Sequence, residues 1–188
     1  MKPRCDYGGL LRRTAIITGS IAAGLLAVAC SVQETIPAPG CVDGASGLIM
    51  AQSVPTASQL PCFTQLPDGW KVVTVNVNQD RTVVTLDSDR AGDGAAVLRF
   101  EERCDVGEAV PAPGHLGSAQ RYDLVVSAAP SFEGRRYYVF PGGCVWWAFD
   151  FDSGTSATEA VALAEALVLI SREDLNASVR ESFIDEEI

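Results

Sequence analysis

Residues 136–151 decide the fold, and they read Arg-Tyr-Tyr-Val-Phe-Pro-Gly-Gly-Cys-Val-Trp-Trp-Ala-Phe-Asp-Phe. The centre of this stretch is Pro141-Gly142-Gly143, whose glycines can adopt the positive φ that a tight turn needs. In the returning half the apolar side chains recur with the period of two that is typical of a β-strand. We expect this apolar face to be buried, because Asp150 marks the opposite face as the hydrated one. The stretch therefore predicts an antiparallel hairpin with a buried row of Val145, Trp147, Phe149 and Phe151.

The same alternation upstream predicts the rest of a sheet. Val73, Val75 and Val77 alternate with polar residues, and Asn78-Gln79-Asp80 supplies the turn to a returning strand. The strands predicted in this way before the hairpin cover residues 73–77, 82–86, 96–101 and 122–127.

After the hairpin the apolar period becomes helical. Ser156-Ala-Thr-Glu159 matches a capping box, in which the serine oxygen and the glutamate each satisfy a free amide of the first turn. The helix predicted behind it has an apolar face of Ala160, Leu163, Ala164, Leu167 and Val168. Ser171 and Asp174 resemble a second cap, which predicts a shorter helix from there.

These patterns predict an α+β fold. We expect an antiparallel sheet of about five or six strands, with one or two C-terminal helices packed on one face and an export or anchor segment in front. A chain of 188 residues favours a single folded domain once that segment is set aside.

The first 32 residues have the three parts of an export signal. Residues 1–13 are basic, residues 14–32 form a run of 19 uncharged residues, and the run ends in small residues. Because the positive end stays inside the cell, everything after the run is expected outside. The predicted organisation is a signal peptide or membrane anchor over 1–29, a lipid-attachment cysteine and flexible tether over 30–47, and an extracytoplasmic α+β domain over 48–188.

The last residues of the uncharged run indicate how the protein is attached to the membrane. Leu26-Ala27-Val28-Ala29-Cys30 resembles the lipobox of bacterial lipoproteins, and the resemblance implies that Cys30 receives a diacylglyceryl group. Ala27-Val28-Ala29 also fits a cut by ordinary signal peptidase, which would release the protein. The run is also just long enough to span a bilayer uncut. Lipid anchor, single span and release are therefore the three alternatives.

Four further cysteines predict disulfides in an oxidising compartment. They lie about twenty residues or more apart, whereas structural zinc sites bring cysteines in close pairs. Three pairings are possible, and the strand order favours Cys41–Cys62 and Cys104–Cys144. Cys104 closes one predicted strand and Cys144 opens another, and such ends lie side by side in an antiparallel pair.

The charge of the chain excludes one class of partner. Residues 1–29 hold four basic residues against one acidic residue, which leaves −13 for the remainder of a chain with a formal charge of −10. Such a remainder is repelled by phosphate backbones, so we expect no nucleic-acid partner. The ordinary interpretation of the acidity is solubility.

Three other patterns in the sequence bear on catalysis and metal binding. His115 is the single histidine and lies in a predicted loop, where a solvated side chain is the ordinary state. Gly143-Cys144-Val145 resembles the nucleophile segment of L,D-transpeptidases, but Gly142 and Trp146 stand where that family has histidine and arginine. Three acids, Asp87, Asp89 and Asp93, share a loop as in calcium sites, although the spacing fails the EF-hand pattern. No catalytic residue, metal or cofactor is therefore predicted.

Several segments, among them Leu66-Pro-Asp-Gly-Trp70 and residues 137–144, are similar to those of small uncharacterised exported proteins of high-GC Gram-positive bacteria. The resemblance implies no activity. The expected function is a membrane-anchored extracytoplasmic lipoprotein that acts as a non-catalytic binding module, with envelope proteins or a small ligand as partners. The alternatives are a single-pass accessory subunit or sensor, and a small cell-envelope enzyme.

Overall fold

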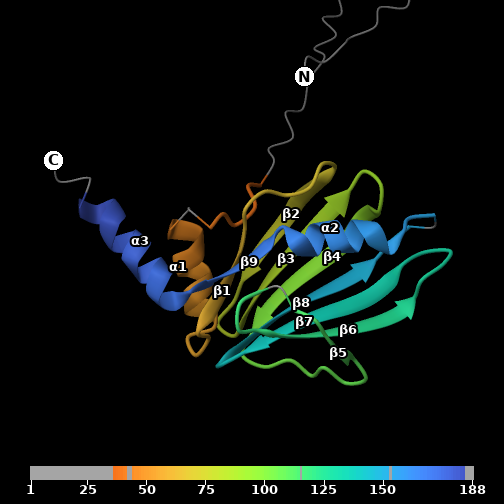
Figure 1. Ribbon diagram of the computed structural model, residues 1–188. Coiled ribbons are helices and arrows are strands. Elements are labelled where there is room, and N and C mark those ends of the chain that lie inside the picture. The colour runs from red at the N-terminus through yellow and green to blue at the C-terminus, as the bar shows by residue number, and fades with distance from the viewer. Residues whose placement is uncertain (1–35, 42–43, 115, 153, 185–188) are drawn as a thin grey trace, which may run out of the picture. The chain divides into compact units, whose positions relative to one another are not determined.

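The computed structural model describes residues 36–41, 44–114, 116–152 and 154–184 (Figure 1). All of the described residues belong to one compact unit, residues 34–188. The predicted export segment, Cys30 and His115 lie outside the described residues. Within the described residues, no helix is both long and apolar enough to span a bilayer.

A seven-stranded antiparallel sheet forms most of the described structure. Its strands run in the spatial order β2 Trp70–Val77, β3 Arg81–Ser88, β4 Gly92–Glu101, β8 Gly143–Asp150, β7 Glu133–Phe140, β6 Gln120–Ser127 and β5 Val110–Ala112. A second, two-stranded antiparallel sheet pairs β1 Gln59–Phe63 with β9 Leu167–Ser171. The antiparallel sheet was predicted correctly, including the hairpin β7–β8 and the turn at 78–80.

The number of strands exceeds the prediction, because β1, β5 and β9 lack a clear alternating pattern. β5 is only three residues long and contains Pro111. β1 contains Pro61, and β9 follows directly on a helix. Proline weakens the strand signal because it cannot donate a backbone hydrogen bond.

Three helices are described: α1 Gly44–Ser53, α2 Ala157–Glu165 and α3 Arg172–Ile184. α2 begins after Ser156, whose hydroxyl accepts a hydrogen bond from the amide of Thr158 at 3.3 Å. Only half of the predicted capping box forms, because Glu159 instead pairs with Arg90 at 3.1 Å. α3 follows the second predicted cap, in which the hydroxyl of Ser171 accepts from the amide of Asp174 at 3.0 Å.

Two sequence predictions need correction here. Leu167 and Val168 were assigned to a helix, but they lie in β9, where Val168 pairs with Cys62 of β1. The alternation grouped Val73 with Val75 and Val77 on the apolar face of a strand, but Val73 is exposed because the register of β2 shifts at this residue. A β-bulge of this kind moves a side chain away from the face that strict alternation assigns to it.

The predicted tether, residues 30–47, also extends too far along the chain, because the folded unit begins before residue 47. Ile36 forms a bridge to Val72, and Gly40 forms one to Phe63. Cys41 is bonded to Cys62 with the Cα atoms 4.9 Å apart, and α1 begins at Gly44. Residues 36–47 were expected to form a tether, yet those described belong to the folded unit because these cross-links hold them there.

The disulfide pairing is confirmed. Cys104 is bonded to Cys144 with a Cα separation of 5.9 Å, alongside the Cys41–Cys62 bond. The reason is the one that the sequence suggested: β4 ends beside the start of β8, where Glu101 pairs with Cys144.

The core lies on one face of the large sheet, which we call the inner face. All three helices and the small sheet contribute buried side chains to it, and Figure 1 shows α2 and β9 lying across that face. Phe63 of β1 packs on Trp147, with ring centroids 6.0 Å apart. The predicted buried row is confirmed, since Val145, Trp147, Phe149 and Phe151 are each at most 3% exposed.

Candidate functional site

The opposite face of the sheet, which we call the outer face, carries a row of large polar and aromatic side chains. In the register of the sheet, Trp146 on β8 lies opposite Arg99 on β4 and opposite Tyr137 on β7. Successive residues of a strand point to opposite faces. These three side chains therefore lie on the outer face, and their neighbours Phe100, Val145 and Tyr138 lie on the inner face. Trp146 and Arg99 are partly exposed there, whereas Tyr137 is buried.

These side chains are in contact around the indole of Trp146. Tyr137 stacks on the indole with ring centroids 5.5 Å apart. The guanidinium of Arg99 lies 5.3 Å from the ring centroid, and that of Arg135 lies 5.9 Å from it. The indole Nε1 donates a hydrogen bond to the carboxylate of Glu101. We call Arg99, Glu101, Arg135, Tyr137 and Trp146 the Trp146 cluster.

The two arginines of this cluster differ from most other cations of the described residues. Lys71, Arg81, Arg90, Arg103, Arg121 and Arg136 each form an ion pair with an aspartate or glutamate. Neither Arg99 nor Arg135 has a carboxylate within ion-pair distance among the described residues. The Nε of Arg99 is moreover buried and has no hydrogen-bond partner there.

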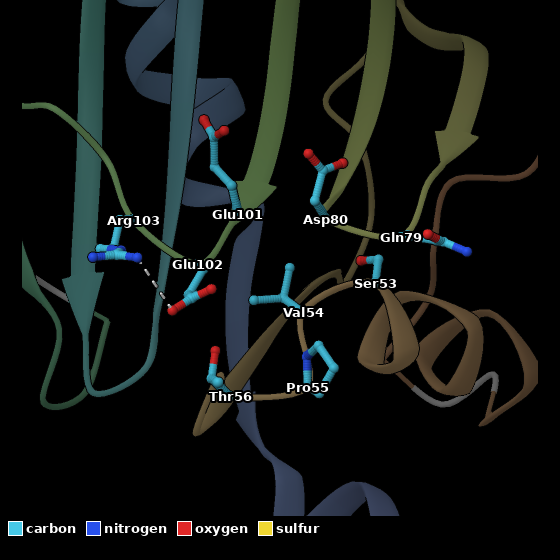
Figure 2. Close-up of a pocket in the computed structure, with 9 residues that line it drawn as sticks. All are labelled: Ser53, Val54, Pro55, Thr56, Gln79, Asp80, Glu101, Glu102 and Arg103. Carbon is cyan, nitrogen blue, oxygen red and sulfur yellow. Dashed lines mark ion pairs between the residues drawn. The ribbon is translucent and has the colours of Figure 1, made fainter.

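Two open hollows adjoin the cluster. The first has a volume of about 290 Å³ and lies where the turn at 78–80, the end of β4 and residues 53–56 meet (Figure 2). The second has a volume of about 800 Å³ and is lined by Arg99, Arg81, Val83 and the same turn. Gln79 and Asp80 line both hollows, so the two adjoin at the turn of residues 78–80.

The first hollow is polar and mainly acidic. Figure 2 shows Glu102 turned toward Arg103, with which it forms an ion pair of 3.8 Å. Asp80 and Glu101 also line it, and Asp80 pairs with Arg81 at 3.3 Å. Glu101 is instead held by the indole of Trp146, which links this hollow to the cluster.

The hydroxyls of the first hollow are already hydrogen-bonded. Ser53 donates to the carbonyl of Met50 at 2.7 Å and lies 2.9 Å from the hydroxyl of Thr82. Thr56 donates to the carbonyl of Gly142 at 2.7 Å. A nucleophilic hydroxyl needs a base within hydrogen-bond reach, and neither contact supplies one. The arrangement is suited to binding, through exposed charge and an aromatic ring.

The residues that the sequence singled out lie elsewhere. Cys144 is fully buried in a disulfide, so its sulfur is not the free thiol that a transpeptidase nucleophile requires. The carboxylate of Asp87 accepts a hydrogen bond from the amide of Gly94 at 2.7 Å and pairs with Lys71, while Asp89 lies near Arg90. Within the described part of the chain, no three potential ligand side chains come together as a metal site would require.

Sequence reasoning missed the Trp146 cluster. Its members are far apart in the chain, and only the register of β4, β8 and β7 joins them. The available signal was the pair Trp146-Trp147: adjacent residues of a strand point to opposite faces, so one of the two indoles had to lie outside the core.

A second charged cluster lies on the inner face, at β6 and β7. The carboxylate of Asp123 accepts hydrogen bonds from Arg136 at 2.9 Å and from Arg121 at 3.0 Å. Burial alone raises the pKa of Asp123, but the hydrogen bonds and charges of these two arginines outweigh it and hold the pKa below its ordinary value.

This arrangement predicts a specific acid sensitivity. Because the folded state lowers the pKa of Asp123, its contribution to stability is present above the unfolded pKa of about 3.9 and is lost as pH falls through the lower folded pKa. Asp123→Asn should therefore be less stable at neutral pH, and its stability should fall less steeply than that of the wild type below about pH 4. Urea unfolding at a series of pH values measures both slopes. Equal slopes of stability against pH for the wild type and Asp123→Asn would show that Asp123 does not contribute to the acid sensitivity.

Comparison with protein-family models, with curated proteins and with solved structures gave no match.

Proposed function

We propose that this protein is a membrane-anchored extracytoplasmic binding module that presents the outer face of its sheet to a ligand or partner. The observation that carries the binding role is the Trp146 cluster: a partly exposed indole with two guanidiniums 5.3 and 5.9 Å from its ring centroid, neither of which has a carboxylate within ion-pair distance among the described residues. Tryptophan, tyrosine and arginine are the residues that contribute most to binding at protein interfaces. Their gathering on the face away from the core has no role in the packing of that core.

The proposed location rests on the leader and on the disulfides. Disulfides form and persist outside the cytoplasm, and both bonds join residues of the folded unit. The basic leader, the uncharged run and the lipobox-like end support export followed by acylation of Cys30. Because Ile36 already belongs to the fold, only the five residues 31–35 separate it from Cys30, and the six steps from Cys30 to Ile36 reach at most about 20 Å. The domain would therefore stay close to the membrane surface.

A binding role is preferred to a catalytic one because the Trp146 cluster and its hollows offer charged and aromatic recognition groups, whereas the candidate nucleophiles Cys144, Ser53 and Thr56 are already bonded. The sulfur of Cys144 is oxidised, and the hydroxyls of Ser53 and Thr56 donate to backbone carbonyls. The charges of Arg99 and Arg135 can hold a ligand, but as permanent cations they cannot act as bases. The alternative is a single-span subunit, and the anchoring experiment below distinguishes it from a lipid-anchored protein.

The anchoring prediction is tested by the intact, non-reduced mass of the full-length protein extracted from membranes with detergent. We expect a mature chain that starts at Cys30, is heavier by a diacylglyceryl group and is lighter by four hydrogens for two disulfides. Cys30→Ser should lose the lipid mass, since serine offers no thiol for acylation.

Two outcomes would contradict the lipid anchor. A mass that retains residues 1–29 without lipid would make the protein a single-span subunit or sensor. A mature chain without lipid, recovered outside the membrane fraction, would show release. Neither outcome depends on what the outer face binds.

A further inference from the structure

We infer that the outer face docks a protein whose own surface is apolar and carries separate carboxylates opposite Arg99 and Arg135. The inference rests on the proposed binding function and names the class of partner that this face fits. Each arginine is expected to meet a carboxylate of its own, because the two lie on β4 and β7, on opposite sides of β8.

The first step is the composition of the outer face, which follows from the register of the sheet. Two adjacent rows of side chains cross β3, β4, β8, β7 and β6 there, and we call them the central rows. Apart from one threonine and the two arginines, their members are apolar or aromatic, and all but Tyr137 are at least partly exposed. The first row consists of Val83, Arg99, Trp146, Tyr137 and Tyr122, and the second of Thr85, Val97, Ala148, Arg135 and Leu124.

The second step is the charge of the central rows. They contain two arginines and no carboxylate, although Asp and Glu outnumber Lys and Arg by 24 to 14 in the chain. Acids on the same face flank the rows instead: Glu101 lies two residues from Arg99 on β4, and Glu133 lies two residues from Arg135 on β7, opposite Asp150. Neither arginine has a carboxylate within ion-pair distance among the described residues. An apolar surface with two such cations is complementary to an apolar surface that carries isolated anions.

The third step is the shape of this surface, which decides the class of partner. Neighbouring strands lie about 4.8 Å apart, so the central rows present a face about 19 Å across. Sites for small molecules are concave and bury most of their ligand, whereas a standard protein interface covers about 800 Å² of each partner. A broad sheet face of partly exposed apolar side chains fits a protein. A polyanion such as nucleic acid is repelled by the flanking acids and by the negative charge of the chain.

Trp146 reports whether the face is covered. It is partly exposed, whereas its neighbour Trp147 is 0% exposed. Hydroxyl radicals should therefore oxidise Trp146 at least threefold more slowly in intact membranes, where the partner is present, than in the full-length protein purified in neutral detergent. Fragmentation mass spectrometry of the peptide that contains both tryptophans measures this. Trp147 should stay unoxidised in both preparations, which shows that the domain is folded.

The chain is well suited to a test by cross-linking, because it contains only two lysines, Lys2 in the leader and Lys71 on β2. A carbodiimide joins a primary amine to a carboxylate in direct contact with it. Arg99→Lys and Arg135→Lys place an amine at each proposed contact, so in intact membranes each should give an adduct with the same second protein, at least tenfold above the wild type. Arg180→Lys, at an exposed position on α3, is the matched control and should stay at the wild-type level.

An exchange of charges separates specific pairing from mere proximity. The mapped adduct identifies the carboxylate of the partner that faces Arg99. Arg99→Glu should remove the protection of Trp146, because it opposes two carboxylates, and replacement of the partner's carboxylate by lysine should restore that protection. Arg180→Glu should leave the protection unchanged.

Four results would overturn the inference. Equal adducts from all three lysine variants would reflect exposure alone, and an adduct with a second copy of this chain would make the outer face a surface for self-association. The third is the absence of an adduct from one or both of the proposed contacts, and the fourth is a charge exchange that restores nothing.

The footprint distinguishes this failure from failure of the proposed function. If no adduct forms and Trp146 is still protected in membranes, the face binds something other than a protein, and the proposed binding function stands. If Trp146 is oxidised equally in both preparations, the binding function fails as well. Neither result affects the mass that tests the anchor.

Discussion

Gly142→Ala is expected to lower the free energy of unfolding by about 3 kcal/mol, which is a large part of the total stability of an ordinary domain. Gly142 has a φ of +71°, a conformation that costs a residue with a Cβ atom about 1–2 kcal/mol. A Cβ atom there would also overlap the backbone carbonyl oxygen of Thr56, and such overpacking typically costs about 1–3 kcal/mol.

The overlap cannot relax easily, because the β7–β8 turn is held against the segment that follows α1. The hydroxyl of Thr56 donates to the carbonyl of Gly142 at 2.7 Å, and the amide of Ser58 donates to the carbonyl of Pro141 at 3.0 Å. A methyl group between them would separate the turn from this segment and break both hydrogen bonds.

Gly94→Ala is the matched control. Gly94 has a similar φ of +63°, but a Cβ atom there would meet nothing within 4 Å. Its cost should therefore be only the backbone term of about 1–2 kcal/mol. Urea unfolding of both variants measures the difference. Equal losses would show that the contact with Thr56 contributes nothing beyond the backbone conformation.

Removal of the Cys104–Cys144 disulfide is expected to have a comparable effect. The bond closes a sequence separation of 40 residues, for which the entropy of the unfolded chain predicts a loss of about 4 kcal/mol in the double variant Cys104→Ser/Cys144→Ser. Cys144 is fully buried, so its replacement also places a polar hydroxyl where a sulfur was packed.

The second disulfide supplies the comparison. Cys41→Ser/Cys62→Ser opens a sequence separation of 21 residues, so the same argument predicts a smaller loss of about 3 kcal/mol. Unfolding of both variants under oxidising conditions gives the two losses, and the fully reduced wild type gives their combined effect. If neither variant lost more than about 1 kcal/mol, the sheet alone would hold these ends, and the entropic account would be wrong.

Local patterns in the sequence were enough to predict most of the large sheet. The alternation in residues 136–151 identified the hairpin and the side that is buried, because a strand determines its two faces within a few residues. The caps at Ser156 and Ser171 were also predictable, since a capping side chain bonds to amides only two or three residues away. The disulfide pairing of the structure is the one that the sequence favoured among three, because the end of one strand lies beside the start of its antiparallel partner.

Three features depended on contacts between distant segments, and no local pattern predicts those. β1 and β9 become strands because they pair with each other across more than a hundred residues. Arg172 donates to the carbonyls of Ala51, Val54 and Ala57 and so satisfies the end of α1, although nothing near it in sequence indicates that role.

The Trp146 cluster is the most important feature of this kind. The sequence by itself placed Arg99 and Trp146 on strands and required that Trp146 and Trp147 point to opposite faces, whereas Arg135 lay just outside the predicted hairpin of residues 136–151. Only the tertiary structure decided that the two arginines meet at one indole, because that depends on the register of β4, β8 and β7. A shift of one residue in either pairing would place an arginine on the other face, and the register is fixed by packing of the whole inner face.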